Sequence, residues 1–107
     1  MIYKFRSKAA GDLIMLATNG DQVLRLIGKE PGHKGIIEVD QMPAAIAALE
    51  AAVVADEQAF EALCAQAREQ GQEPPRRQDI GLRQRAWPMV EMLRRAHAHQ
   101  HHITWGV

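Results

Sequence analysis

An alanine-rich segment over residues 41–70 constrains the fold of this 107-residue chain more than any other feature. Alanine has the highest helix propensity, and Pro43 falls in the first turn, where its missing N–H costs little. Asp40 is the expected N-cap, and Gly71 is the expected stop. Apolar residues recur at alternating four- and three-residue steps, interrupted by Asp56, as on one face of a helix: Met42, Ile46, Leu49, Val53, Phe60, Leu63 and Ala67. A helix about 45 Å long must bend, break or find a partner in a domain with a radius of gyration near ~13 Å.

A second helix is predicted over residues 80–98, with Asp79 as its cap and a kink at Pro88, which lacks the N–H that would bond to the preceding turn. Residues 40–73 carry one Arg and seven acids, whereas residues 74–107 carry six Arg and two acids. The two helices are therefore expected to form an antiparallel hairpin with one acidic and one basic arm. The apolar stripe of the second helix is Leu82, Ala86, Met89, Val90, Leu93 and Ala96.

Residues 18–28 are open to two interpretations. Asn19-Gly20 is a strong hairpin signal, which would make residues 22–27 a strand. A short helix is favoured because Gly28 sits where a C-terminal glycine ends a helix and because the apolar residues have helical spacing. These apolar residues are Val23, Leu24, Leu26 and Ile27.

Short apolar or alternating runs bounded by turns predict the remaining strands. The strands are expected at 2–7, 13–17, 35–39 and 102–105, with a turn at Gly11-Asp12. The last strand has two possible partners, the first and the third. The chain is thus predicted to form a single α+β domain over residues 1–107, in which a small, mainly antiparallel sheet of about four strands is packed by the long helical hairpin and one short helix.

Histidines near the C-terminus are the most suggestive chemical feature. On a helix His97 and His101 are one turn apart, and with His102 they are candidate ligands for zinc or nickel. No nearby Cys, and no Asp or Glu after Glu91, completes a metal site. The alternative is a solvated helix end, where histidine favours the helix dipole. The cluster comprises His97, His99, His101 and His102.

The glycine-containing loop at residues 28–35 could bind a small anion. It fits no phosphate-loop register, so it is either a small-anion nest or a plain loop. Six arginines make the C-terminal third basic, but a nucleic-acid surface would interleave aromatics, and only Trp87 is available. With zero net charge, we expect no nucleic-acid partner. The arginines are Arg76, Arg77, Arg83, Arg85, Arg94 and Arg95.

Trp87 lies off the apolar stripe of the second helix, between Arg83 and Glu91 on the helix surface. A tryptophan in such a place is either an interface anchor or an extension of the core beside Pro88. Trp87, Arg83 and Glu91 are the candidate interface residues, and the overlong first helix makes a second copy of the chain a candidate partner.

The sequence contains no recognisable set of catalytic residues. No nucleophile–base or acid–base pair is recognisable, so no cofactor or catalytic residue is assigned. The single cysteine, Cys64, allows no intramolecular disulfide. With no signal-peptide pattern and no apolar stretch near the ~20 residues of a membrane span, the expected location is the cytoplasm, without membrane association.

Several local motifs together resemble a small bacterial family catalogued only as a domain of unknown function. The motifs are Tyr3-Lys4-Phe5-Arg6-Ser7-Lys8-Ala9-Ala10-Gly11-Asp12, Asn19-Gly20-Asp21-Gln22, Leu26-Ile27-Gly28-Lys29-Glu30-Pro31, Leu82-Arg83-Gln84-Arg85-Ala86-Trp87-Pro88 and Trp105-Gly106-Val107. The resemblance implies a short bacterial protein with no assigned activity. The leading expectation is a non-enzymatic, self-associating or protein-interaction module, and the alternative is a protein that binds a metal or a small anion through the histidines or the 28–35 loop.

Overall fold

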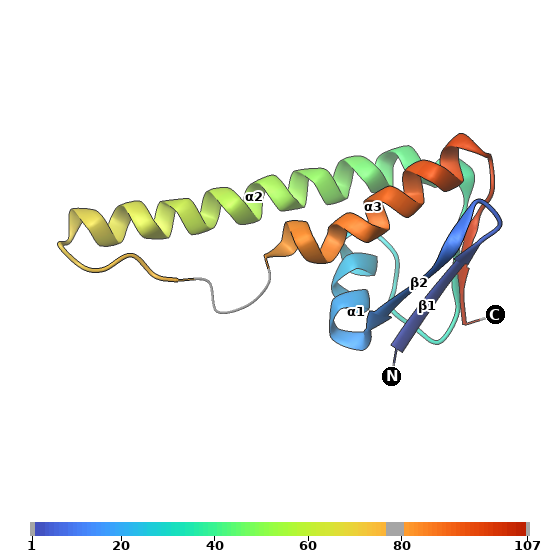
Figure 1. Ribbon diagram of the computed structural model, residues 1–107, viewed down its shortest axis with the longest axis horizontal. Helices are drawn as coiled ribbons and strands as arrows, with labels where there is room; N and C mark the ends of the chain where they lie inside the picture. The colour runs from blue at the N-terminus through green and yellow to red at the C-terminus, as the bar shows by residue number, and fades with distance from the viewer. Residues whose placement is uncertain (1, 77–80, 107) are drawn as a thin grey trace.

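The structure is a computed structural model that describes residues 2–76 and 81–106. A small sheet lies at one end, and a long helical hairpin extends from it (Figure 1). The predicted α+β class is confirmed. The elements in chain order are β1 (Ile2–Ser7), β2 (Ala10–Leu16), α1 (Ala17–Leu26), β3 (Gly35–Ile37), the 3-10 turn η1 (Val39–Gln41), α2 (Met42–Glu69), α3 (Leu82–Ala98) and β4 (Ile103–Trp105).

The four strands form one antiparallel sheet in the order β2-β1-β4-β3. The last strand lies between the first and the third and pairs with both, with Trp105 opposite Phe5 on one side and opposite Gly35 on the other. The predicted turn at Gly11-Asp12 is wrong. The chain turns at residues 8–9, so that Ala10 pairs with Ser7 and β2 begins three residues before its predicted start.

The ambiguous segment is the helix α1, and the hairpin alternative is wrong. The hydrogen bonds at the C-terminus of α1 explain why this segment is a helix. The N–H groups of Gly28 and Lys29 bond back to the carbonyls of Arg25 and Leu24, and Gly28 has a φ of +83°. This is the paired bonding of a Schellman motif, in which glycine adopts the left-handed conformation at no steric cost.

The long helix α2 is observed within one residue of its predicted limits, and Pro43 lies in its first turn. The expected cap at Asp40 is wrong, because Asp40 lies inside η1, and the capping box is made by Glu38 and Gln41. A helix of 28 residues is about 42 Å long. It accounts for a longest dimension of 52 Å and a radius of gyration of 16.0 Å.

The second hairpin helix, α3, continues through Pro88 as one helix. Its N-cap is Gly81, and the predicted cap Asp79 lies outside the described residues. At its other end the N–H groups of Gln100 and His101 bond to the carbonyls of His97 and Ala96. Gln100 stands at φ +58°, in the position that glycine holds at the end of α1.

The core lies between one face of the sheet and the three helices. Its aromatic part is a row on the inner sheet face, where the Tyr3 and Phe5 rings stack with centroids 5.7 Å apart and Phe5 meets Trp105 edge-on at 5.8 Å. Ion pairs across the hairpin join Arg83 to Glu57 and Arg94 to Glu50. The predicted contrast between an acidic and a basic helix is therefore used inside the chain.

Candidate functional site

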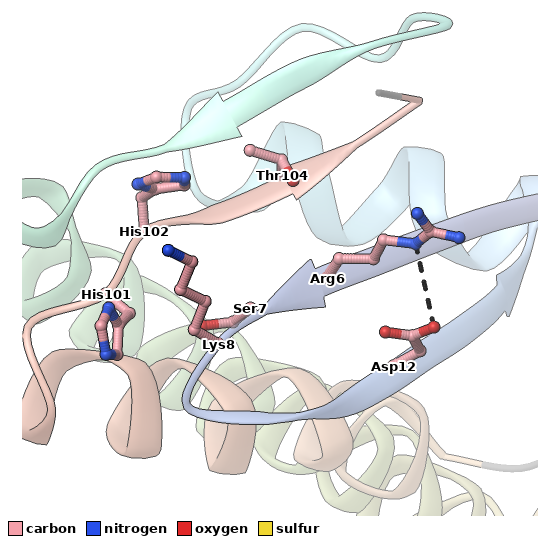
Figure 2. Close-up of a pocket in the computed structure, with 7 residues that line it drawn as sticks. All are labelled: Arg6, Ser7, Lys8, Asp12, His101, His102 and Thr104. Carbon is pink, nitrogen blue, oxygen red and sulfur yellow. Dashed lines mark ion pairs between the residues drawn. The ribbon is translucent and has the colours of Figure 1, made fainter.

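A basic hollow of about 470 Å³ lies beside the sheet. Its residues come from two parts of the sequence, namely the β1–β2 hairpin and the segment from the end of α3 into β4 (Figure 2). We call it the basic hollow; it is lined by Arg6, Ser7, Lys8, Asp12, His101, His102 and Thr104.

The backbone explains how the histidines reach this place. Because α3 ends at Ala98, the left-handed Gln100 turns the chain, and the N–H of His101 is tied to the Ala96 carbonyl at 2.9 Å. The chain then enters β4 beside β1, where Thr104 pairs with Arg6. This pairing brings His102 and His101 to the turn that carries Lys8.

Charge in the basic hollow is predominantly positive and partly unpaired. Asp12 lies 3.8 Å from the Arg6 Nε and 3.6 Å from the Lys4 ammonium, so its charge is shared between two cations. Within residues 2–76 and 81–106, the side chains of Lys8, His101 and His102 have no hydrogen-bond or ion-pair partner. In Figure 2 the Lys8 ammonium extends toward His102, with His101 close by.

The metal prediction named His97, His101 and His102. The structure brings His101 and His102 to the basic hollow, whereas His97 remains half-buried within α3. No group of three or more His, Cys, Asp or Glu side chains that could hold a metal ion occurs in the described parts of the chain. Zinc or nickel binding remains a prediction.

The basic residues Arg6 and Lys8 were not among the predicted site residues. The alternation of β1 does indicate that Arg6 faces away from Tyr3 and Phe5. It does not indicate that the histidines lie beside it, because that depends on β4 entering the sheet next to β1.

The loop at residues 28–35 is attached to the C-terminal strand. The Trp105 Nε1 donates a hydrogen bond of 3.1 Å to the Gly32 carbonyl, and a Cβ on Gly35 would lie 2.2 Å from the Trp105 ring. Two of its glycines thus have structural roles, since Gly28 ends α1 and Gly35 makes room for the indole. A small-anion site in this loop remains a prediction.

The predicted interface residue Trp87 lies beside the groove between α2 and α3 and is 39% exposed. The Arg94 guanidinium lies 5.1 Å from its ring centroid and also contacts Glu91 at 3.3 Å. Arg83 donates two hydrogen bonds of 3.0 and 2.8 Å to Glu57, which raise the pKa of the Arg83 guanidinium above its ordinary value. The three predicted residues therefore lie on one rim of the hairpin.

From this groove, which we call the Trp87 groove, α2 continues outward as a helical arm, defined here as residues 54–69. The buried residues of α2 end at Val53, and none in the helical arm is buried. Leu63 is 56% exposed, and Phe60, Cys64 and Ala67 are half-buried. The Cys64 thiol contacts the Pro75 carbonyl at 3.8 Å, so the chain after the helix returns along part of the arm.

The outer face of the sheet carries a second apolar surface, which sequence reasoning missed. Ile2, Ile14 and Leu16 are 57%, 59% and 70% exposed, and Ile2 pairs with Leu16 across β1 and β2. The alternation of β1 was a signal for Ile2, because it places this residue on the side opposite Tyr3. We call these three residues the aliphatic corner.

Comparison with known proteins places the chain in a family. Neither the curated proteins nor the solved structures give a match. None of the helices in the described part of the chain is long and apolar enough to cross a membrane. The family model described as a domain of unknown function (DUF1840) matches residues 1–105. The chain therefore belongs to the DUF1840 family.

Proposed function

We propose that the protein is a non-enzymatic, self-associating module of the bacterial cytoplasm and that the helical arm and the Trp87 groove form its contact surface. The observation that carries this proposal is the absence of buried residues from 54 to 69 in α2. The apolar side chains of the arm are only partly covered, since Leu63 is 56% exposed and Phe60 is half-buried, and burying such surface is favourable. Contact with another chain would stabilise the arm.

The apolar residues of this surface are suited to such a contact. Trp87 and Val54 line one groove between α2 and α3, and Leu63 lies farther along the same arm. Tryptophan is enriched among the residues that contribute most to interface affinity. Arg–Glu pairs border the Trp87 ring and would form the polar rim that surrounds an interface core.

Charge favours a second copy of this chain as the partner. Part of the charge of the hairpin is used inside the chain, where Arg83 pairs with Glu57 and Arg94 pairs with Glu50. The helical arm also carries Glu61 and Glu69, and α3 also carries Arg95. In a two-fold dimer each acidic arm would lie along the basic helix of the other copy. Complementary charge of this kind aligns partners and speeds their encounter.

Analytical ultracentrifugation over a concentration series tests the proposal. Leu63→Ser on the arm is compared with Leu16→Ser in the aliphatic corner, because the same exposed side chain is changed at two distant places. We expect Leu63→Ser to weaken the dimer about tenfold, since an interface leucine contributes ~1.5 kcal/mol or more. Leu16→Ser should leave the dimer unchanged. A monomer at high micromolar concentration would overturn the proposal, as would dissociation by Leu16→Ser alone.

A charge-reversal pair tests the electrostatic part. Glu61→Lys on the helical arm should weaken the dimer, and the weakening should lessen as salt is added, because exposed charges are screened. Glu30→Lys makes the same charge change on the exposed 28–35 loop and should have no effect. Equal effects of the two variants would show that net charge, and not the arm, controls association.

A further inference from the structure

We propose that the basic hollow binds the phosphoryl group of a small phosphorylated ligand, such as a phosphomonoester or a pyrophosphate. This inference is independent of self-association, because the hollow is built from the β1–β2 hairpin and the start of β4, and these elements lie at the opposite end of the molecule from the helical arm (Figure 1). It rests on the convergence of donor groups from two segments far apart in the sequence, residues 6–8 and residues 101–104, on one depression (Figure 2).

The chemistry of the lining suits an anion. Arginine presents several N–H groups in a fixed fork, and lysine presents a compact charge, which are the two common ways that proteins hold phosphate. The Ser7 Oγ accepts a hydrogen bond from the Ala9 N–H at 3.2 Å, so its own hydroxyl proton is available to a ligand. Thr104 adds a second hydroxyl, and the imidazoles of His101 and His102 can each donate at least one N–H.

Asp12 is the only acid in the lining. Its carboxylate is already neutralised by Lys4 and Arg6, at 3.6 and 3.8 Å. A phosphoryl oxygen that approached Arg6 would compete with Asp12 for the guanidinium. Asp12 therefore opposes anion binding, and replacing it with a neutral residue tests whether an anion binds at Arg6.

Size favours a phosphoryl group with an attached substituent over a bare ion. A hollow of about 470 Å³ falls in the range of small-molecule sites and exceeds the volume of one phosphate. Lys8, His101 and His102 are at one side of it and Arg6 at the other, as Figure 2 shows. A ligand that contacts both sides must therefore be larger than a single phosphate.

Isothermal titration with inorganic pyrophosphate, with inorganic phosphate as the smaller probe, tests the proposal. We expect pyrophosphate to bind more tightly than phosphate. Lys8→Gln should weaken pyrophosphate binding about tenfold, the effect of losing one charge-assisted hydrogen bond worth ~1.4 kcal/mol. Asp12→Asn should tighten binding. The imidazole NMR signals of His101 and His102 should shift during the titration, and that of His33 should not.

Lys34→Gln is the matched control, because Lys34 is exposed just before β3, next to the end of β4 remote from His102. It changes the net charge as Lys8→Gln does, and it should alter the pyrophosphate affinity less than twofold. Equal weakening by the two variants would show that pyrophosphate is attracted by the overall charge of the protein and not by the basic hollow, and this result would overturn the proposal. An absence of pyrophosphate binding at millimolar concentration, or weaker binding by Asp12→Asn, would overturn it as well.

Discussion

Replacing Gly20 by alanine should destabilise the protein, although the same change inside an exposed helix stabilises by about 1 kcal/mol. Gly20 is buried in α1 against the Tyr3 ring. A Cβ there would lie 2.1 Å from the Tyr3 Cδ2 and 2.7 Å from its Cε2, whereas ordinary contacts begin at 3.4 Å. Either α1 or the ring must therefore move by more than an ångström.

Neither movement is easy. The Tyr3 ring is stacked on Phe5, and its hydroxyl donates a hydrogen bond to Asp21, the residue next to Gly20. Overpacking costs ~1–3 kcal/mol, and a broken hydrogen bond to a carboxylate costs ~1.5–3 kcal/mol. After the gain in helix propensity is subtracted, we expect Gly20→Ala to lower the free energy of unfolding by about 2 kcal/mol.

Thermal and urea unfolding followed by circular dichroism measure this loss. At ~2.1 cal/mol/K per residue, 107 residues give an unfolding entropy of ~0.22 kcal/mol/K, so about 2 kcal/mol lowers Tm by roughly 9 °C. Gly11→Ala is the control, because a Cβ at Gly11 meets nothing within 4 Å, and it should leave Tm unchanged or slightly raised. In a Tyr3→Leu background the penalty of Gly20→Ala should shrink by at least ~1 kcal/mol. A Tm for Gly20→Ala at or above that of the parent protein would refute the close approach of α1 to Tyr3.

Three further predictions concern stability. Gln100→Gly should raise the free energy of unfolding by about 0.5–1 kcal/mol, because φ +58° strains any residue other than glycine; a lower Tm would contradict this. Burial, followed by the hydrogen bond to Asp21, raises the pKa of Tyr3, so the unfolded state releases that proton first. Stability should thus fall as pH rises above about 10, the pKa of the unfolded state, and Tyr3→Phe should flatten that fall; a slope equal to that of the parent would contradict this. Trp105→Phe removes the hydrogen bond to the Gly32 carbonyl. It should speed amide hydrogen exchange in residues 28–35 and lower the free energy of unfolding by about 1 kcal/mol. Unchanged exchange would show that this hydrogen bond does not hold the loop in place.

Local pattern was sufficient for the two long helices of this fold, whereas it left the segment of α1 open between helix and strand. The helix predicted over residues 41–70 is observed at Met42–Glu69, since its limits depend on Pro43 and Gly71, which act through their own backbone conformations. The cap at Asp40 failed for an equally local reason. A 3-10 turn precedes α2, and Gln41 bonds back to the Glu38 N–H at 3.0 Å, which leaves Asp40 inside the turn.

The arrangement of the sheet needed information that local pattern does not contain. The sequence left two partners open for the last strand, and β4 in fact pairs with both β1 and β3. Pairing between residues almost a hundred positions apart depends on how the whole chain packs. His101 and His102 of the basic hollow were therefore predicted as site residues, because they are close together in the sequence. Arg6 and Lys8 were not predicted to lie beside them.

The length of α2 separates the two surfaces for which function is proposed. The part of this helix up to Val53 is buried against the core, and the remainder carries Leu63 away from the sheet along the 52 Å axis. The basic hollow depends on the opposite end, where Gln100 turns the chain toward β4. A contact confined to the helical arm and the groove beside Trp87 would leave the basic hollow open, and a dimer of that kind would hold one phosphorylated ligand in each copy. Because distant sites act additively, Leu63→Ser and Lys8→Gln each report on one surface, and the failure of one proposal leaves the other standing.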